Sequence, residues 1–188
     1  MTILVLGVAL WWAAHFLKSV TPRLRDGMTE RMGEAGARGV IAGLVLLSVV
    51  LMVVGFVWAP FQHLYTPPSW AVHVNNVAML VAIYLLGLGH SSGRARRWLR
   101  HPMLLGVIVW AGAHLLANGD LAALILFGGL AAWAIVSMLL INMREGAWRR
   151  PDAGSARGDV KHIVLTVVIF AVFAGVHMLV GPSPFPGG

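Results

Sequence analysis

Long apolar stretches separated by short polar segments make up most of the chain. A helix rises about 1.5 Å per residue, so about 20 apolar residues cross the roughly 30 Å hydrocarbon core of a bilayer. Backbone groups inside lipid must be hydrogen-bonded within their own segment, so such stretches are predicted to be helices. Six stretches reach or approach this length: roughly residues 2–18, 39–59, 70–90, 103–118, 121–143 and 160–181. We therefore expect an all-α integral membrane bundle of about six transmembrane helices, with five as the alternative.

The basic residues alternate with these stretches. All fourteen Lys and Arg residues lie in or beside the first, third and fifth connections, and the other connections and both termini carry none. Short loops rich in Lys and Arg stay in the cytoplasm. This predicts a multi-pass protein of the bacterial cytoplasmic (inner) membrane with both termini outside, in the periplasm. The first segment lacks the basic region and cleavage site of a signal peptide, so we expect a retained first span.

Composition excludes several other classes of protein. Hydrophobic residues make up 59% of the chain and charged residues 11%, against about 25% charged in soluble domains. The net charge of +7 could indicate nucleic-acid binding. The basic residues, however, lie in short connections, where the membrane topology explains them, so no nucleic-acid partner is expected. With no cysteine in the chain, disulfides, thiolate catalysis and thiolate-held metals are excluded.

Small residues and prolines predict local features of the bundle. Gly39 and Gly43, and Gly128 and Ala132, recur at four-residue spacing, which is typical of close helix packing in membranes. Pro102 stands where the fourth helix would begin, at a position that needs no N–H. Residues 1–182 are expected to form a single transmembrane domain, and 183–188 a loose tail. Three prolines are expected to end the sixth helix: Pro182, Pro184 and Pro186.

Histidine is the main candidate for chemistry. Imidazole binds haem iron, copper or zinc where thiolates are absent, and carboxylates are nearly missing from the apolar stretches, which lowers the case for a proton or cation pump. In the predicted topology the eight histidines form a cytoplasmic and an outer layer. Most can be interfacial residues or hydrogen-bond donors to a neighbouring helix. For His15 and His114, which apolar residues flank on both sides, a ligand role and a structural role remain equally open.

Tryptophans accompany both of these histidines. Trp11 and Trp12 precede His15 by about one turn, and Trp110 precedes His114 by one turn. Residues at i and i+4 share a helix face. Two such faces could wall a flat, apolar cofactor such as a porphyrin, or the indoles could be interfacial or packing residues.

Three segments resemble the NnrU family of membrane proteins. They are residues 14–23 (Ala-His-Phe-Leu-Lys-Ser-Val-Thr-Pro-Arg), residues 100–106 (Arg-His-Pro-Met-Leu-Leu-Gly) and residues 110–119 (Trp-Ala-Gly-Ala-His-Leu-Leu-Ala-Asn-Gly). The resemblance runs through the first five predicted helices. Members occur in denitrifying bacteria, in association with nitrite and nitric oxide metabolism. A plant relative, 15-cis-ζ-carotene isomerase, resembles the chain in the same blocks and uses haem b.

The resemblance implies a set of cofactor-binding residues. The isomerase's two proposed haem ligands fall on His15 and His114, with Trp11, Trp12 and Trp110 packing nearby. Arg100 and His101 are candidates for propionate contact or for supporting the motif. In the predicted topology His15 and His114 lie roughly 10 Å or more apart along the membrane normal. The alternates for the metal are therefore His73 and His177.

The resemblance also implies a function, with two departures from the isomerase. A cysteine and a further histidine of that enzyme are Ala111 and Trp133 here, so ligand switching through a thiolate is not available. The favoured function is a non-covalent haem b protein linked to denitrification, acting on an apolar polyene by redox-dependent isomerase-like chemistry, or on a small gaseous ligand or electrons with a respiratory reductase as partner. The alternative is a cofactor-free transporter or an accessory or assembly subunit.

Overall fold

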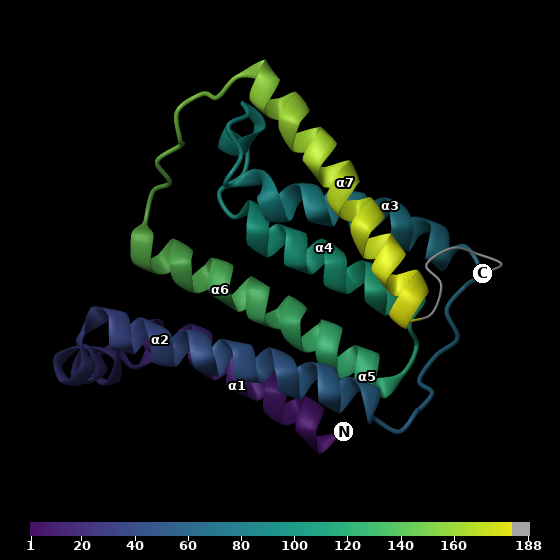
Figure 1. Cartoon of the computed structure of the whole chain (residues 1–188), viewed down its shortest axis with the longest axis horizontal. Helices are drawn as coiled ribbons and strands as arrows, with labels where there is room; N and C mark the ends of the chain where they lie inside the picture. The colour runs from purple at the N-terminus through teal and green to yellow at the C-terminus, as the bar shows by residue number, and fades with distance from the viewer. Residues whose placement is uncertain (182–188) are drawn as a thin grey trace. The chain divides into compact units, whose positions relative to one another are not determined.

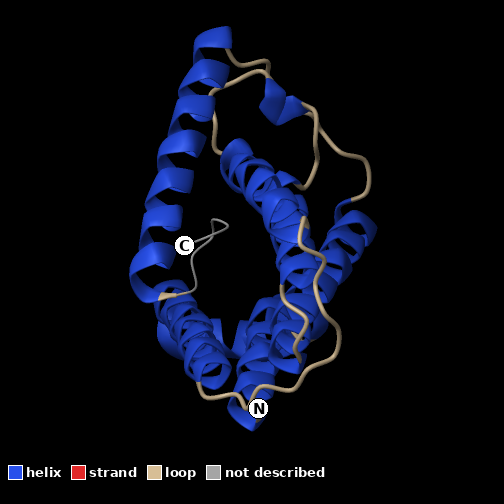
Figure 2. Ribbon diagram, turned by 90° about the vertical axis from the view of Figure 1, so that its right-hand side faces the viewer, coloured by secondary structure: helices blue, strands red, loops and turns tan. Residues whose placement is uncertain are grey.

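The computed structural model describes residues 1–181, and all its regular secondary structure is helical (Figures 1 and 2). The predicted loose tail at 183–188 and the three prolines Pro182, Pro184 and Pro186 lie outside the described residues. The elements follow in chain order: α1 Thr2–Val20, α2 Pro22–Val57, α3 Ala71–Leu88, η1 Ala95–Arg97, α4 Pro102–Ala117, α5 Leu121–Ala123, η2 Leu124–Gly128, α6 Gly129–Glu145 and α7 Ala156–Val180.

The all-α prediction is confirmed, and every apolar stretch named above is helical. The segments α5, η2 and α6 form one helix from Leu121 to Glu145, with a wider π-type turn at η2. Pro102 opens α4 as expected. Among the described residues, four helices are long and apolar enough to cross a membrane, at Pro22–Val57, Ala71–Leu88, Leu121–Glu145 and Ala156–Leu179. The apolar parts of α1 and α4 are shorter.

The first connection differs from the prediction, because it is helical and not a loop. Only Thr21 separates α1 from α2, which is 36 residues long and starts with Pro22 at its first turn. The helix is interrupted at Gly33, whose φ of 74° places it in the left-handed region that favours glycine. Residues 22–38 are rich in Arg, Met, Glu and Ala, which favour helix but carry no hydropathy signal for a span.

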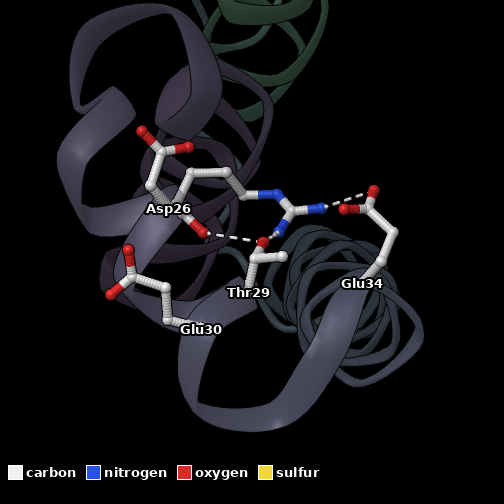
Figure 3. Close-up of a pocket in the computed structure, with 5 residues that line it drawn as sticks. Asp26, Thr29, Glu30 and Glu34 are labelled. Atoms are coloured by element: carbon white, nitrogen blue, oxygen red, sulfur yellow. Dashed lines mark hydrogen bonds and ion pairs between the residues drawn. The ribbon is translucent and has the colours of Figure 1, made fainter.

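An ion pair between Arg25 and Glu34 spans this break in α2 (Figure 3). Arg25, before the break, donates to Thr29 Oγ1 at 2.5 Å and to Glu34 Oε1 at 3.3 Å. Arg38, after the break, donates to the same Glu34 oxygen at 3.0 Å. The Glu34 carboxylate therefore joins the segments on either side of Gly33.

The described residues divide into two compact units, residues 1–64 with 120–129 and residues 65–119 with 130–181. In the first unit α1 packs against α2 through two glycines. A Cβ on Gly7 would lie 2.7 Å from the Met52 nitrogen, and one on Gly55 would lie 2.6 Å from the Leu4 Cα. The expected contacts through Gly39 and Gly43 are wrong, because a Cβ on either would meet nothing within 4 Å. Spacing alone does not show which face of a helix is covered.

In the second unit α3 packs against α4 and α7. Gly106 of α4 lies against α3, where a Cβ would come within 2.9 Å of the Ala82 carbonyl oxygen. The segments before η1 and before α7 also meet: Ser155 N donates to Ser92 O at 3.0 Å. Asp159 Oδ2 accepts from Arg94 Nε at 3.1 Å, and its Oδ1 accepts from the Ala95 amide at 3.1 Å.

We predict that Gly55→Ala destabilises the α1–α2 pair, whereas Gly43→Ala on the same helix does not. The new methyl at position 55 would push against backbone, which should lower the free energy of unfolding by about 1–3 kcal/mol. At position 43 the space is open, and alanine favours helix by about 1 kcal/mol over glycine. Thermal unfolding of the detergent-solubilised variants, followed by circular dichroism, measures both. Equal effects at the two positions would contradict the packing described here.

Candidate functional site

A tryptophan and a histidine form a contacting pair on α1. The rings of Trp11 and His15 have their centroids 4.1 Å apart at an interplanar angle of 33°. His15 Nδ1 lies 2.8 Å from the carbonyl oxygen of Trp11, one turn earlier. Both side chains are half-buried. The i and i+4 spacing in the sequence thus produces a ring contact together with a hydrogen bond to the backbone.

The same arrangement occurs on α4, in the other unit. Trp110 and His114 have ring centroids 5.2 Å apart at 51°, and His114 Nδ1 lies 2.9 Å from the Trp110 carbonyl oxygen. Asn118 Nδ2 donates to the carbonyl oxygen of His114 at 2.8 Å and so closes the end of this helix. We call the Trp11–His15 and Trp110–His114 pairs the two Trp–His modules.

The backbone bond determines the tautomer of each imidazole. A carbonyl oxygen only accepts, so Nδ1 of His15 and of His114 must carry the proton and donate it. In the neutral ring the lone pair is then on Nε2. Metal-ligating histidines commonly donate one ring N–H to a carbonyl or carboxylate in this way, which fixes the ring and raises its basicity. Both modules therefore hold their histidine in a form that can coordinate iron through Nε2.

The remaining tryptophan on α1 has a structural bond of its own. Trp12 Nε1 donates to the Gly129 carbonyl oxygen at 3.0 Å, which ties α1 to the junction of η2 and α6 within the first unit. Ala111 is fully buried and Trp133 is 7% exposed. These are the positions where the isomerase has a cysteine and a histidine, and neither side chain here is a ligand for iron.

The alternates His177 and His73 differ from each other. His177 on α7 is exposed and repeats the backbone bond of the modules, with Nδ1 2.9 Å from the Phe173 carbonyl oxygen. His73 lies exposed in the first turn of α3. Of the two, only His177 shows the tautomer-fixing bond, so it is the stronger alternate.

Arg100 and His101 lie just before α4 and reach the C-terminal end of α6. Arg100 donates to the Gly146 carbonyl oxygen at 2.6 Å and lies 3.7 Å from Glu145 Oε2. His101 Nε2 and Asn142 Oδ1 are 2.8 Å apart. A cation close to the last carbonyls of a helix is favoured by the helix dipole. We call these five residues the α4–α6 clasp.

Sequence reasoning missed the partners in these contacts. Asn142 and Gly146 belong to no recognisable sequence motif. Only the fold brings them next to the family's Arg-His-Pro segment. By sequence His162 could be an interfacial residue, but it is 7% exposed, and its Nε2 donates to the Tyr84 carbonyl oxygen at 2.8 Å. Tyr65 hydroxyl donates to the carbonyls of Leu115 and Asn118 at the end of α4. A hydropathy pattern contains no signal for bonds of this kind.

Among residues 1–181 no three His, Asp or Glu side chains gather as a metal site. Haem needs less from the protein, since one or two imidazoles complete the coordination of an iron that the porphyrin already holds. Each Trp–His module offers one such imidazole with an indole beside it.

The described residues form an all-helical protein with four helices long and apolar enough to cross a membrane, and with backbone-anchored histidines on two of its helices. The family model described as NnrU protein matches residues 3–184. The chain belongs to the NnrU family, and the resemblance seen in the first five predicted helices extends over nearly the whole chain. No curated protein and no solved structure matches it.

We predict that His101 and Asn142 stabilise the fold together. The bond between them is partly exposed to solvent, so the coupling free energy should be about 0.5–1 kcal/mol. The measurement is a double-mutant cycle of His101→Ala, Asn142→Ala and the double variant, followed by thermal unfolding in detergent. Fully additive losses would show that the two side chains do not interact.

Proposed function

We propose that this NnrU family member is a haem b-binding protein of the bacterial inner membrane, in which His15 and His114 would hold the haem non-covalently through its iron. The observation that carries the proposal is the shared geometry of the two Trp–His modules. In each, the i−4 carbonyl fixes the ring with Nε2 as the lone-pair nitrogen. Both histidines also lie in the sequence blocks that resemble the haem-dependent plant isomerase.

The proposed topology has six spans with both termini in the periplasm. It is supported by the four long apolar helices and the two shorter ones, and by the basic residues, which occupy alternate connections. The charged first part of α2 fits this topology, since it belongs to a connection that the positive-inside rule keeps in the cytoplasm. His177 remains the stronger alternate for a second ligand in addition to His114, and His73 remains the weaker alternate.

The protein's own residues have defined roles in this proposal. The carbonyls of Trp11 and Trp110 orient the two imidazoles, and the indoles provide apolar walls for a flat macrocycle. Arg100 and His101 are candidates for propionate contact. Because Arg100 already pairs with Glu145 and Gly146, a propionate there would have to compete with the Glu145 carboxylate.

A bound haem would supply one-electron chemistry or a coordination site for a small gaseous ligand. Two activities suit it: redox-dependent isomerisation of an apolar polyene, or nitric oxide and electron handling beside a respiratory reductase in denitrification. The buried Ala111 in place of the isomerase's cysteine removes thiolate switching and therefore favours the second. The protein's contribution in either case is to hold the imidazoles and keep water away from them.

A cofactor-free transporter or accessory subunit is the second candidate function. The bonding of His162 favours it, because this buried histidine donates to the backbone of α3 in a purely structural contact. If His15 and His114 are bonded to their own helices for the same reason, the modules would be packing features. The two functions differ in whether the purified protein contains haem.

We predict that His15→Ala and His114→Ala each lower the haem content of the purified protein, whereas His63→Ala does not. Loss of an axial nitrogen should weaken haem retention by more than about tenfold, since even outer-sphere changes at metal sites cost 10–100-fold. The pyridine haemochrome assay on detergent-purified variants measures this, and circular dichroism checks their folding. His63 is an exposed loop residue and serves as the matched control.

His177→Ala separates the two ligand pairs. If His177 replaces His15 as the second ligand, its removal should lower haem content and His15→Ala should not. Unchanged haem content in His15→Ala, His114→Ala and His177→Ala would overturn the proposed site.

A further inference from the structure

A groove of about 680 Å³ runs between α3 and α7 within the second unit. Ligand pockets in proteins commonly measure about 300–1,000 Å³. The C-terminal end of α3 forms one wall and the first half of α7 forms the other, and the two helices contact each other (Figure 1). None of its lining residues belongs to the Trp–His modules or to the α4–α6 clasp.

The lining is polar at one end and apolar along the rest. His90, Ser91, Ser92 and Lys161 line the polar end, where α3 has ended and α7 is in its first turns. The apolar part follows α7 past its middle, and Phe173 is the last residue of α7 that lines the groove. An occupant that satisfies both ends must be amphipathic.

The charge at the polar end favours an anion. Lys161 is a lining cation, and no carboxylate lines the groove. The nearest acid along the helix, Asp159, accepts from Arg94 Nε and the Ala95 amide. The cation Arg94 and the carboxylate of Asp159 are therefore paired with each other, and neither lines the groove. Lys161, which is exposed, faces no acidic side chain among the groove's lining residues.

The length of the apolar part fits one acyl chain. Lys161 and Phe173 are twelve residues apart on α7, so about 18 Å of helix separates them. Half of a roughly 30 Å hydrocarbon core is about 15 Å. The groove is thus about as long as one leaflet is deep, with its polar end beside the basic connection that the positive-inside rule assigns to the cytoplasm.

A buried histidine keeps the apolar wall in place. The His162 ring, 7% exposed, donates through Nε2 to the Tyr84 carbonyl oxygen, and its centroid lies 4.7 Å from that of the Tyr84 ring. Gly87 makes room for it, because a Cβ there would lie 2.8 Å from His162 Cε1. The hydroxyl of Thr166, one turn later, donates a hydrogen bond to the His162 carbonyl oxygen at 2.9 Å.

We infer that this groove binds one anionic phospholipid, with its head group at Lys161, His90 and Ser91 and an acyl chain along Leu165 and Phe173. Basic pockets between membrane helices on the cytoplasmic side are a recurring site for anionic head groups. The inference does not depend on haem, since the groove and the Trp–His modules share no residue. It requires only that the second unit sits in a bilayer.

The test is native mass spectrometry of the full chain released from nanodiscs of equal phosphatidylglycerol and phosphatidylcholine. The wild type should retain one lipid per chain, with phosphatidylglycerol preferred by about fivefold, the effect expected of one Lys near an anionic surface. Lys161→Gln should abolish the preference. Arg149→Gln removes the same charge from an exposed position in the connection before α7 and should keep it.

Filling the apolar part tests the acyl chain separately. Leu165→Trp should lower the retention of both lipids, and circular dichroism confirms that the variants are folded. Added inorganic phosphate should not displace the lipid. Equal retention of the two lipids by the wild type, or equal behaviour of Lys161→Gln and Arg149→Gln, would overturn the inference, as would displacement by phosphate or a retained mass that belongs to another molecule.

Discussion

Backbone carbonyls accept hydrogen bonds from several polar side chains of these apolar helices. Water is not there to accept a hydrogen bond inside such a bundle, and an unpaired polar group costs several kcal/mol. Ser48 donates to the Val45 carbonyl, Thr166 to the His162 carbonyl and His162 to the Tyr84 carbonyl. His15 and His114 obey the same constraint with carbonyls of their own helices. The hydrogen bonds that satisfy the imidazoles of His15 and His114 in an apolar environment are therefore the same bonds that orient them as candidate ligands.

For the two modules this constraint has a chemical consequence. A carbonyl that satisfies Nδ1–H also selects the tautomer with the lone pair on Nε2, and the indole one turn earlier limits where the ring can move. A histidine bonded through Nε2, such as His162, is held in the opposite way. The ring nitrogen used in the hydrogen bond thus distinguishes the two histidines proposed as ligands from His162, which joins α7 to α3.

Hydropathy was sufficient to predict the helices, since every apolar stretch is helical, and the sequence blocks correctly indicated the family. It was insufficient where polar residues form structure: residues 22–38 are helical around a break at Gly33, a feature that local propensity and one positive φ explain. The glycine spacing selected Gly39 and Gly43, whereas Gly7 and Gly55 make the close contacts, because packing depends on which face is covered. The partners of Arg100 and His101, on α6, are set by tertiary structure that no single-sequence pattern contains.

The most direct measurement of the central claim is the optical spectrum of the detergent-purified protein, first oxidised and then reduced with dithionite, with a pyridine haemochrome assay on the same sample. Two imidazole ligands should give a Soret band, sharp α and β bands on reduction, and near-stoichiometric haem b. A colourless protein, after expression with haem supplied, would contradict the haem proposal and leave the modules as packing features of a cofactor-free membrane protein.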